Sequence, residues 1–203
     1  MTDAGPRPVT VTAPRFILAS ASPRRLDLLA RIGVVPSAVD PADCDETPGR
    51  GEVPTVYARR IAAEKAAHVA ARHPGAVVLA ADTVVAAGRR ILGKANHAEE
   101  AQQFLRLLSG RRHRVHTAVT VIDAAGVARH RLSTSILLFK TLSPAEIQAY
   151  VASGEWQGKA GAYAVQGYAE AFVRRLSGSH SGVMGLPLFE SRALLITAGV
   201  IPQ

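Results

Sequence analysis

The residues most able to do chemistry lie at the start of a helix near the beginning of the chain. Residues 16–29 predict a short apolar strand, a turn and the first turns of a helix, with Ser22 as its N-cap. Arg24 and Arg25 fall in the first helical turn, where the helix dipole already places partial positive charge. If an anion lay between these guanidiniums, the Ser20 hydroxyl and free backbone N–H groups would complete a phosphate site. On this motif alone, arginines that point into solvent are an equally good interpretation.

Carboxylates supply the second half of the chemistry. Residues 76–87 form an almost continuous apolar run, broken by Asp82 and Thr83, which predicts a strand buried on both faces. A carboxylate inside such a strand must be paired, bound to a metal or catalytic, because burying an unpaired charge is costly. The loop at 40–51 is favoured as a solvated surface loop, although its acidity also suits a divalent cation or a substrate. Its four carboxylates are Asp40, Asp43, Asp45 and Glu46.

Three lysines could bring positive charge to the same place. Lys65 ends an apolar stripe on the helix predicted over 53–73, where a lysine usually extends to solvent but could equally reach into a cleft. Lys94 and Lys159 each follow a glycine in a predicted loop. Cations bind phosphate oxygens, whereas carboxylates hold a divalent metal and can activate a water molecule. Together these residues suit phosphoryl transfer to water, although each alone is a weak indication.

Composition and the absence of common motifs argue against several other classes of function. The 203 residues carry a net charge of +8, which favours an anionic ligand such as nucleic acid, but the 5% aromatic content argues against a single-strand-binding protein. The chain has no zinc-type Cys/His spacing, no Gly-x-Ser-x-Gly motif and no glycine-rich nucleotide fingerprint. Its one cysteine, Cys44, excludes an intrachain disulfide. Because the sequence shows no signal peptide and no membrane-spanning run, we expect a cytoplasmic protein with no membrane partner.

Helices and strands interleave along the chain, which predicts an α/β fold with a mixed sheet. Residues 1–14 predict a flexible tail, residues 158–167 a glycine-rich loop that lines a site, and residues 177–182 a polar flexible segment. Further strands are expected at 34–39, 91–92, 113–122, 127–140 and 171–176, of which 113–122 and 127–140 would pair as a hairpin. Further helices are expected at 96–108, with a capping box at Asn96 and Glu99, at 143–153 and at 187–199.

Several segments, taken in order, resemble the Maf family of nucleoside triphosphate pyrophosphatases. The matches extend from about residue 16 to residue 198, and the ordered set is far more specific than any one segment. They are Leu18-Ala-Ser-Ala-Ser-Pro-Arg-Arg25, Asp43-Cys-Asp-Glu-Thr47, Ala63-Glu-Lys-Ala66, Ala81-Asp-Thr-Val-Val85, Ile91-Leu-Gly-Lys94, Leu107-Leu-Ser-Gly110, His116-Thr-Ala-Val119, Tyr150-Val-Ala-Ser-Gly154, Lys159-Ala-Gly-Ala-Tyr-Ala-Val-Gln-Gly167 and Val183-Met-Gly-Leu-Pro187.

This resemblance implies a Maf-like elongated mixed β-sheet flanked by helices, with two lobes and a central cleft, in a single domain over residues 15–203. It implies hydrolysis of a nucleoside triphosphate to the monophosphate and pyrophosphate by metal-assisted attack of water on the α-phosphate. The divalent metal would be Mg²⁺, with Mn²⁺ and Co²⁺ as alternatives, and the chain would form a homodimer. The segment 159–167 resembles the branch that acts on dTTP and UTP, and modified pyrimidine nucleotides are further candidate substrates.

The resemblance also assigns roles to single residues. Asp82 matches the proposed general base, and the specificity positions match Arg24, Thr83 and Gln166. The phosphate-contacting positions match Ser20, Arg24, Arg25, Lys65, Lys94 and Lys159. The metal would be held by Asp45, Glu46 and Asp82. A glutamine side chain offers both a donor and an acceptor, which suits the O4 and N3–H edge of uracil or thymine.

Two alternatives stay open. A related pyrophosphatase could act on 7-methyl-GTP, although that branch has a different sequence at 159–167. A non-catalytic nucleic-acid-binding protein of division control would use the +8 charge. The carboxylates beside the cations would repel a nucleic-acid backbone, so we expect no specific nucleic acid partner. The chain departs from common family residues at Ala21, Leu26 and near Gly182, and none of these is a proposed catalytic position.

Overall fold

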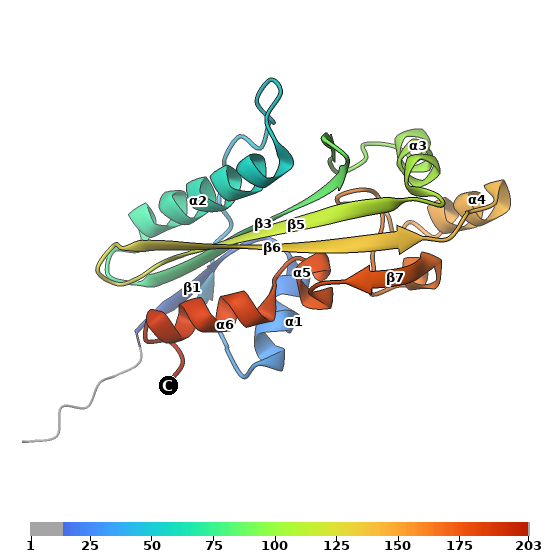
Figure 1. The fold of residues 1–203 in the computed structure, drawn as a ribbon. Coiled ribbons are helices and arrows are strands. Elements are labelled where there is room, and N and C mark those ends of the chain that lie inside the picture. Colours follow the sequence, from blue (N-terminus) through green and yellow to red (C-terminus); the bar gives the residue numbers. More distant parts are fainter. Residues whose placement is uncertain (1–13, 203) are drawn as a thin grey trace, which may run out of the picture.

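A mixed sheet of seven strands runs through the computed structural model, which describes residues 14–202 (Figure 1). The strand order is β2-β1-β3-β5-β6-β7, and β4 pairs with β3 beside this path. The strands are β1 (Phe16–Ala19), β2 (Ala38–Val39), β3 (Val77–Ala87), β4 (Arg90–Leu92), β5 (Arg112–Ile122), β6 (Ala128–Phe139) and β7 (Val173–Ser177). The predicted α/β class with a mixed sheet is therefore confirmed, whereas the predicted tail lies outside the described residues except for residue 14.

Both parallel and antiparallel pairs occur in the sheet. β1 is parallel to β2 and to β3, and the remaining pairs are antiparallel. β5 and β6 form the predicted hairpin, with Ile122 opposite Ala128 at its turn end. Parallel neighbours need a long crossover, and α1 supplies it between β1 and β2, whereas α2 connects β2 to β3 on the other side of β1.

Helices cover both faces of the sheet (Figure 1). One face is covered by α2, whereas α1, α5 and α6 lie on the other face, and α3 and α4 pack together near one end of the sheet. The helices are α1 (Pro23–Arg31), α2 (Pro54–Arg72), α3 (Ala98–Leu108), α4 (Pro144–Ala152), α5 (His180–Met184) and α6 (Leu188–Thr197), together with a 3₁₀ turn at Tyr168–Phe172. In the part of the chain that the structure describes, no helix combines the length and apolarity needed to span a membrane.

The central strand β3 is buried on both faces, as its apolar sequence predicts. Its even-numbered residues, such as Val78 and Val84, pack in the clusters beneath α2, where alanines let the helix approach closely. Its odd-numbered residues, such as Leu79, pack in the larger core on the opposite face. Asp82 and Thr83 are consecutive residues of this strand, so their side chains leave it on opposite faces.

The sheet has an opening beside the middle of β3. β1 makes its last pair with β3 at Ala19 and Ala80, and β4 makes its first pair at Val85 and Leu92. Between these points, residues 81–84 pair only with β5 among the described strands. The β3 edge that carries Asp82 and Thr83 is therefore exposed to any molecule that enters between β1 and β4.

Four local predictions need correction. β2 begins only at Ala38, because Pro36 cannot donate a ladder hydrogen bond. The cap of α3 is shifted by one residue, since His97 accepts from Glu100 N. Residues 171–172 belong to the 3₁₀ turn, so β7 begins later. Residues 180–182 of the segment predicted as flexible begin α5, whose N-cap Ser179 accepts a 2.9 Å hydrogen bond from the backbone N–H of Gly182.

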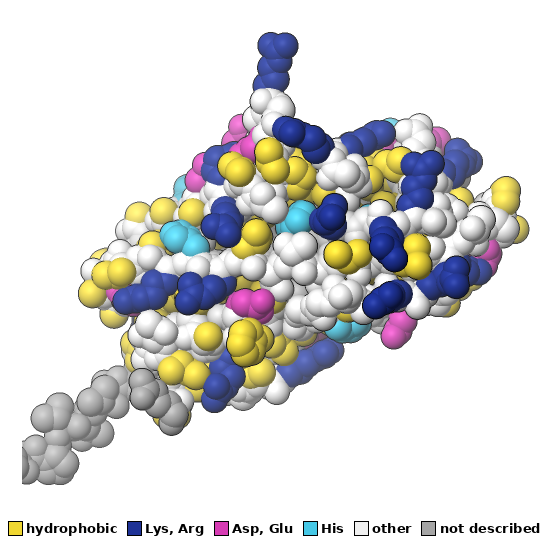
Figure 2. Space-filling view, in the orientation of Figure 1, with side chains coloured by type: hydrophobic (Ala, Val, Ile, Leu, Met, Phe, Trp, Pro, Cys, Tyr) yellow, Lys and Arg dark blue, Asp and Glu magenta, His cyan; other side chains and the backbone are white. Residues whose placement is uncertain are grey.

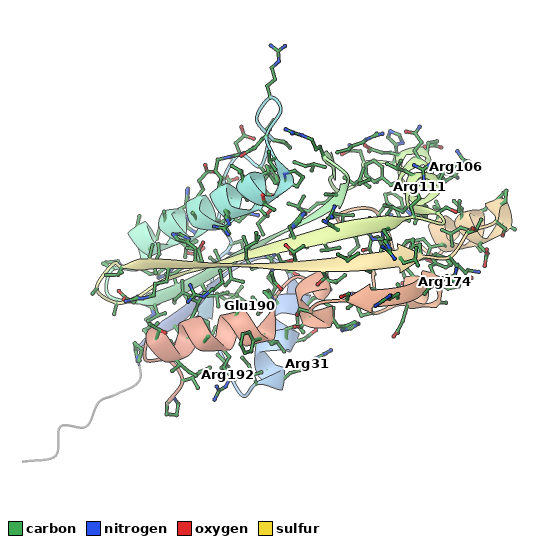
Figure 3. All side chains as sticks on the ribbon, in the orientation of Figure 1. Arg31, Arg106, Arg111, Arg174, Glu190 and Arg192 are labelled. Atoms are coloured by element: carbon green, nitrogen blue, oxygen red, sulfur yellow. The ribbon has the colours of Figure 1, made fainter. Side chains whose placement is uncertain are left out.

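Positive side chains are spread over the face seen in Figure 2 rather than gathered into one continuous track. Figure 3 shows the same dispersion, since its labelled arginines come from different elements, with Arg106 and Arg111 near one another at the end of α3. These exposed residues are Arg31, Arg106, Arg111, Arg174 and Arg192. Much of the net charge is therefore distributed over separate surface positions.

Candidate active site

A cleft of about 650 Å³ lies at the opening in the sheet. Its walls are the turn between β1 and α1, the middle of β3, the end of β4, segments of the loops at 41–48 and 157–166, and the end of α5 at 183–185. Every predicted site residue except Asp45 lines it. These lining residues are Ser20, Arg24, Arg25, Glu46, Lys65, Asp82, Thr83, Lys94, Lys159 and Gln166.

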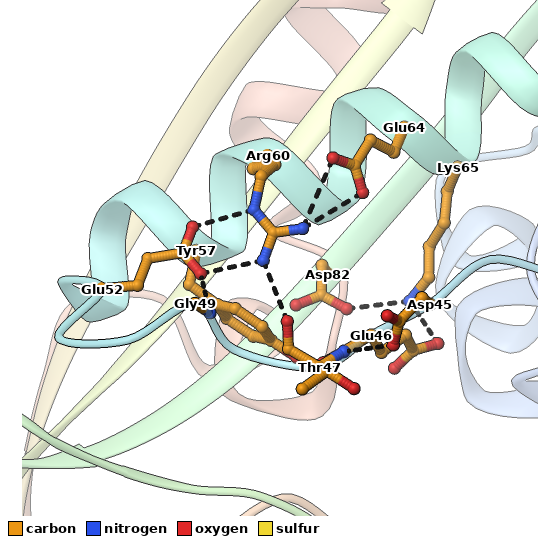
Figure 4. A network of polar contacts seen from close by, with 10 residues as sticks. All are labelled: Asp45, Glu46, Thr47, Gly49, Glu52, Tyr57, Arg60, Glu64, Lys65 and Asp82. Carbon is orange, nitrogen blue, oxygen red and sulfur yellow. Dashed lines mark hydrogen bonds and ion pairs between the residues drawn. The ribbon is translucent and has the colours of Figure 1, made fainter.

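Two carboxylates share one ammonium group at the centre of the cleft (Figure 4). Lys65 Nζ lies 2.9 Å from Asp82 Oδ1 and 2.9 Å from Glu46 Oε1. Lys65 and Asp82 are both buried, with 8% and 6% of their surface exposed. Lys65 therefore reaches into the cleft rather than to solvent, and it supplies the partner that a carboxylate in a buried strand requires.

The electrostatic balance keeps Glu46 ionised. Burial alone would raise its pKa, but the hydrogen bond from Lys65 and the charges of Lys65, Lys94 and Arg25 lower the pKa below its usual value. Lys94 Nζ lies 3.9 Å from Glu46 Oε2 and is largely exposed. The carboxylate thus carries its negative charge at neutral pH, in a cleft whose other charges are mainly positive.

Side chains of α2 hold the acidic loop against the cleft, and Figure 4 shows this network. Tyr57 donates a 2.7 Å hydrogen bond from its hydroxyl to the Glu46 carbonyl oxygen, and Arg60 forms a 2.8 Å ion pair with Glu52. Asp45 is exposed, and its Oδ1 accepts a 2.8 Å hydrogen bond from Thr47 N. Of the two predicted metal ligands in this loop, only Glu46 therefore lines the cleft.

The roles of Tyr57 and Arg60 were not anticipated from the sequence. Tyr57 and Lys65 share one stripe of α2 at a spacing of eight residues, and that spacing is the signal that could have revealed Tyr57. The partner of Arg60 is Glu52, which lies in the irregular segment before α2, and helix periodicity does not predict a contact with such a segment.

The two arginines of α1 turn toward the cleft and bind backbone carbonyls at the end of α5. Arg25 donates to the Gly185 carbonyl at 2.8 Å and to Ser20 Oγ at 2.9 Å, whereas Arg24 donates to the Met184 carbonyl at 3.4 Å. Burial lowers the pKa of Arg25, and the charge of nearby Asp82 opposes that effect. The interpretation that both arginines point into solvent is therefore wrong.

The glycine-rich loop at 157–166 forms the wall opposite α2. Buried tyrosines and a histidine hold it: the Tyr150 hydroxyl accepts from Ala164 N at 3.0 Å, and Tyr163 is hydrogen-bonded to His113 Nε2 at 2.9 Å. Gly161 approaches β3 so closely that a Cβ there would lie 2.8 Å from a methyl carbon of Val85, which explains the need for glycine. The loop is thus well anchored, while the Gln166 side chain that it carries is exposed.

The carboxylate pair also suits a divalent cation. Among the described residues, no group of three or more His, Cys, Asp or Glu side chains gathers to bind a metal. Mg²⁺ is usually held by one or two carboxylates together with phosphate oxygens of a substrate and water. Asp82 and Glu46 already meet around the Lys65 ammonium, so they fit a cation that completes its coordination with a phosphate ligand.

The chain is similar to known proteins over most of its length. The chain is 62% identical over 187 residues to a dTTP/UTP pyrophosphatase of Zymomonas mobilis, covering 92% of this chain and 93% of that protein. It is 57% identical over 198 residues to a dTTP/UTP pyrophosphatase of Rhodospirillum rubrum, covering 98% and 94%. A solved HAM1 protein from Coxiella burnetii aligns with 90% of this chain and 98% of that chain, at 19% identity and a TM-score of 0.48. The family described as Maf-like protein matches residues 15–198, and the chain belongs to that family.

Proposed function

We propose that this protein hydrolyses dTTP and UTP to the nucleoside monophosphate and pyrophosphate. The observation that carries the proposal is the Asp82–Lys65–Glu46 cluster, which lies in one cleft with the arginines of α1. Relatives at 57–62% identity that are named dTTP/UTP pyrophosphatase support the same reaction and the same bases. The chemistry is attack of water on a phosphorus atom, for which charge stabilisation and positioning supply most of the rate.

The cations of the cleft bind the triphosphate. Arg24 and Arg25 project from the first turn of α1, where the helix dipole also attracts an anion. Lys94 and Lys159 approach the cleft from β4 and from the glycine-rich loop. When the bond to the α-phosphate breaks, the β- and γ-phosphates leave as pyrophosphate and gain negative charge. The guanidinium and ammonium groups stabilise this additional charge.

Asp82 is the base of the proposed reaction. Its Oδ1 is bound to Lys65 Nζ at 2.9 Å, which fixes the orientation of the carboxylate. Its Oδ2 is then free to accept a proton from the attacking water. Asp82 and Glu46 would hold the divalent metal that this family of pyrophosphatases implies, and the metal, when bound, would neutralise phosphate charge.

The opposite wall of the cleft recognises the base. Gln166 and Thr83 lie on that side, and an amide side chain can both donate to and accept from the edge of uracil or thymine. The exposed Asp45 is not included in this proposal, because its carboxylate accepts a hydrogen bond from Thr47 N within the same loop. The choice of Mg²⁺ over Mn²⁺ or Co²⁺, the homodimer, the single-domain boundaries and the cytoplasmic location stay predictions.

The direct test is a pyrophosphate-release assay with Mg²⁺ on dTTP, UTP, CTP, dATP, GTP and 7-methyl-GTP in parallel. We expect selective turnover of dTTP and UTP. Turnover of 7-methyl-GTP alone would keep the reaction and reject the proposed bases. Absence of turnover with Mg²⁺, Mn²⁺ and Co²⁺ would reject the enzyme and return attention to nucleic-acid binding, which a salt-dependent binding assay would detect.

A further inference from the structure

The acidic loop, residues 40–51, reaches the cleft without a helix or strand of its own. Its cleft carboxylate, Glu46, has 41% of the side chain exposed. An ion pair this exposed contributes little to stability, because water screens it and both side chains lose freedom. The 2.9 Å contact of Glu46 with Lys65 therefore does not explain by itself why the loop lies at the cleft.

Two side chains from one turn of α2 hold consecutive carbonyl groups of this loop (Figure 4). The Tyr57 hydroxyl donates to the carbonyl oxygen of Glu46 at 2.7 Å. Arg60 Nη2 donates to the carbonyl oxygen of Thr47 at 3.2 Å. The guanidinium also lies over the Tyr57 ring, 5.5 Å from its centroid, as residues three apart on a helix can. The backbone that follows Glu46 is therefore held in two successive peptide units.

The same guanidinium holds the far end of the loop. Arg60 donates to both carboxylate oxygens of Glu52, each at 2.8 Å. Glu52 Oε2 also accepts from Gly49 N at 2.8 Å, and only 11% of the Glu52 side chain is exposed. A bidentate arginine–carboxylate pair is stronger than an ordinary surface ion pair. Arg60 therefore fastens the segment 47–52 to α2 at both of its ends.

We propose that Arg60 is a positioning residue of the reaction, which holds the acidic loop so that the Glu46 carboxylate stays beside the Lys65 ammonium group. This inference rests on the proposed hydrolysis of dTTP and UTP, in which Glu46 would help to hold the divalent metal. In the part of the chain that the structure describes, Arg60 does not line the cleft. Its effect on the reaction must therefore pass through the loop.

Hydrogen exchange tests the anchoring of the loop without any measurement of activity. Arg60→Met removes every guanidinium contact but keeps an unbranched side chain at the same position. We expect the hydrogen-bonded amides of Thr47 and Gly49 to exchange about tenfold faster, because the loop leaves α2 more often. The matched control is Arg59→Met, an exposed neighbour on the same helix, which should leave this exchange unchanged. Unchanged exchange in Arg60→Met would overturn the inference.

A double-mutant cycle on kcat/KM for UTP tests whether the effect passes through Glu46. Arg60→Met should lower kcat/KM by about tenfold in the unchanged chain. In Glu46→Gln, which retains Asp82 and measurable turnover, the same change should lower it by less than about twofold, because the carboxylate to be positioned is absent. A general structural defect would lower kcat/KM equally in both backgrounds. That result would overturn the inference and leave the proposed function standing.

The remaining outcomes also separate the two proposals. If Glu46→Gln alone left kcat/KM for UTP unchanged, Glu46 would have no part in the reaction, and the inference would be overturned while UTP hydrolysis stood. If Arg60→Met failed to fold, Glu52→Gln would replace it, with the same expected exchange and the same expected cycle. No turnover of any nucleotide by the unchanged chain would overturn both proposals.

Discussion

The two walls of the cleft are held in place by different kinds of interaction. On the α2 side, charged groups hold the wall: Lys65 bridges Asp82 and Glu46. On the opposite side, neutral hydrogen bonds from buried aromatic residues hold the glycine-rich loop, through Tyr150 and the His113–Tyr163 pair. The charged wall carries the proposed base and metal ligands, Asp82 and Glu46, whereas the neutral wall carries Gln166 together with Lys159. Under the proposed function, we expect the base and the metal ligands to act from the first wall and recognition of uracil or thymine to take place at the second.

Removing the charge of Asp82 should have the largest effect. Asp82→Asn keeps the shape of the side chain but removes the proposed base, so turnover of dTTP and of UTP should fall by about 10²-fold or more. Pyrophosphate release measures the loss, and circular dichroism verifies the fold. Asp123→Asn, in the turn between β5 and β6, is the control that should stay active. Unchanged turnover in folded Asp82→Asn would reject Asp82 as the base.

Removing the cation of the same wall should destabilise the protein. Lys65→Met leaves Asp82 buried without its partner, so the free energy of unfolding should fall by about 3 kcal/mol. Urea denaturation measures this change, with the exposed Arg59→Met on the same helix as control. Adding Asp82→Asn to Lys65→Met should restore much of the lost stability, because the unpaired charge is then absent. No restoration would mean that Lys65 stabilises α2 in another way.

Much of the fold was predictable because each element carries a local signal. The apolar run of β3 and the helix at 143–153 were predicted correctly, since periodicity and capping act over a few residues; the structure shows a capping box at Ser143 and Glu146. α5 was read as flexible because its Ser and Gly residues favour turns, and the Ser179 cap forms only in that particular backbone arrangement. Short local signals of this kind do not distinguish a one-turn helix from a loop.

The site was predictable as a set of residues through the family resemblance, but its geometry was not. The sequence did not decide whether the Lys65 side chain extends to solvent or reaches into the cleft, because a lysine at the end of an apolar helical stripe can do either. The burial of Arg25 against α5 joins segments about 160 residues apart, which no local pattern encodes. Tyr57 acts through the backbone carbonyl of Glu46, a partner that has no recognisable sequence signature.

The neutral wall should respond to pH through His113, with a smaller effect. Burial lowers the pKa of His113 to about 4 from its ordinary value of 6.5, so the unfolded chain takes up a proton before the folded one does. The stabilising contribution of neutral His113 is therefore full above about pH 6.5 and is lost as the pH falls toward 4. The free energy of unfolding should decrease by about 2 kcal/mol between pH 7 and 5. Denaturation at both pH values, compared with His113→Gln, isolates this contribution. An equal decline in His113→Gln would assign it to other groups.

The division between the walls is tested most directly by steady-state kinetics on UTP with Asp82→Asn and Gln166→Leu measured side by side. Asp82→Asn should lower kcat by about 10²-fold with little change in KM, because it removes an interaction needed in the transition state. Gln166→Leu should raise KM by about tenfold with little change in kcat, because it removes a contact to the base in both states. If Gln166→Leu lowered kcat as severely as Asp82→Asn and left KM unchanged, reaction and recognition would not be divided between the two walls.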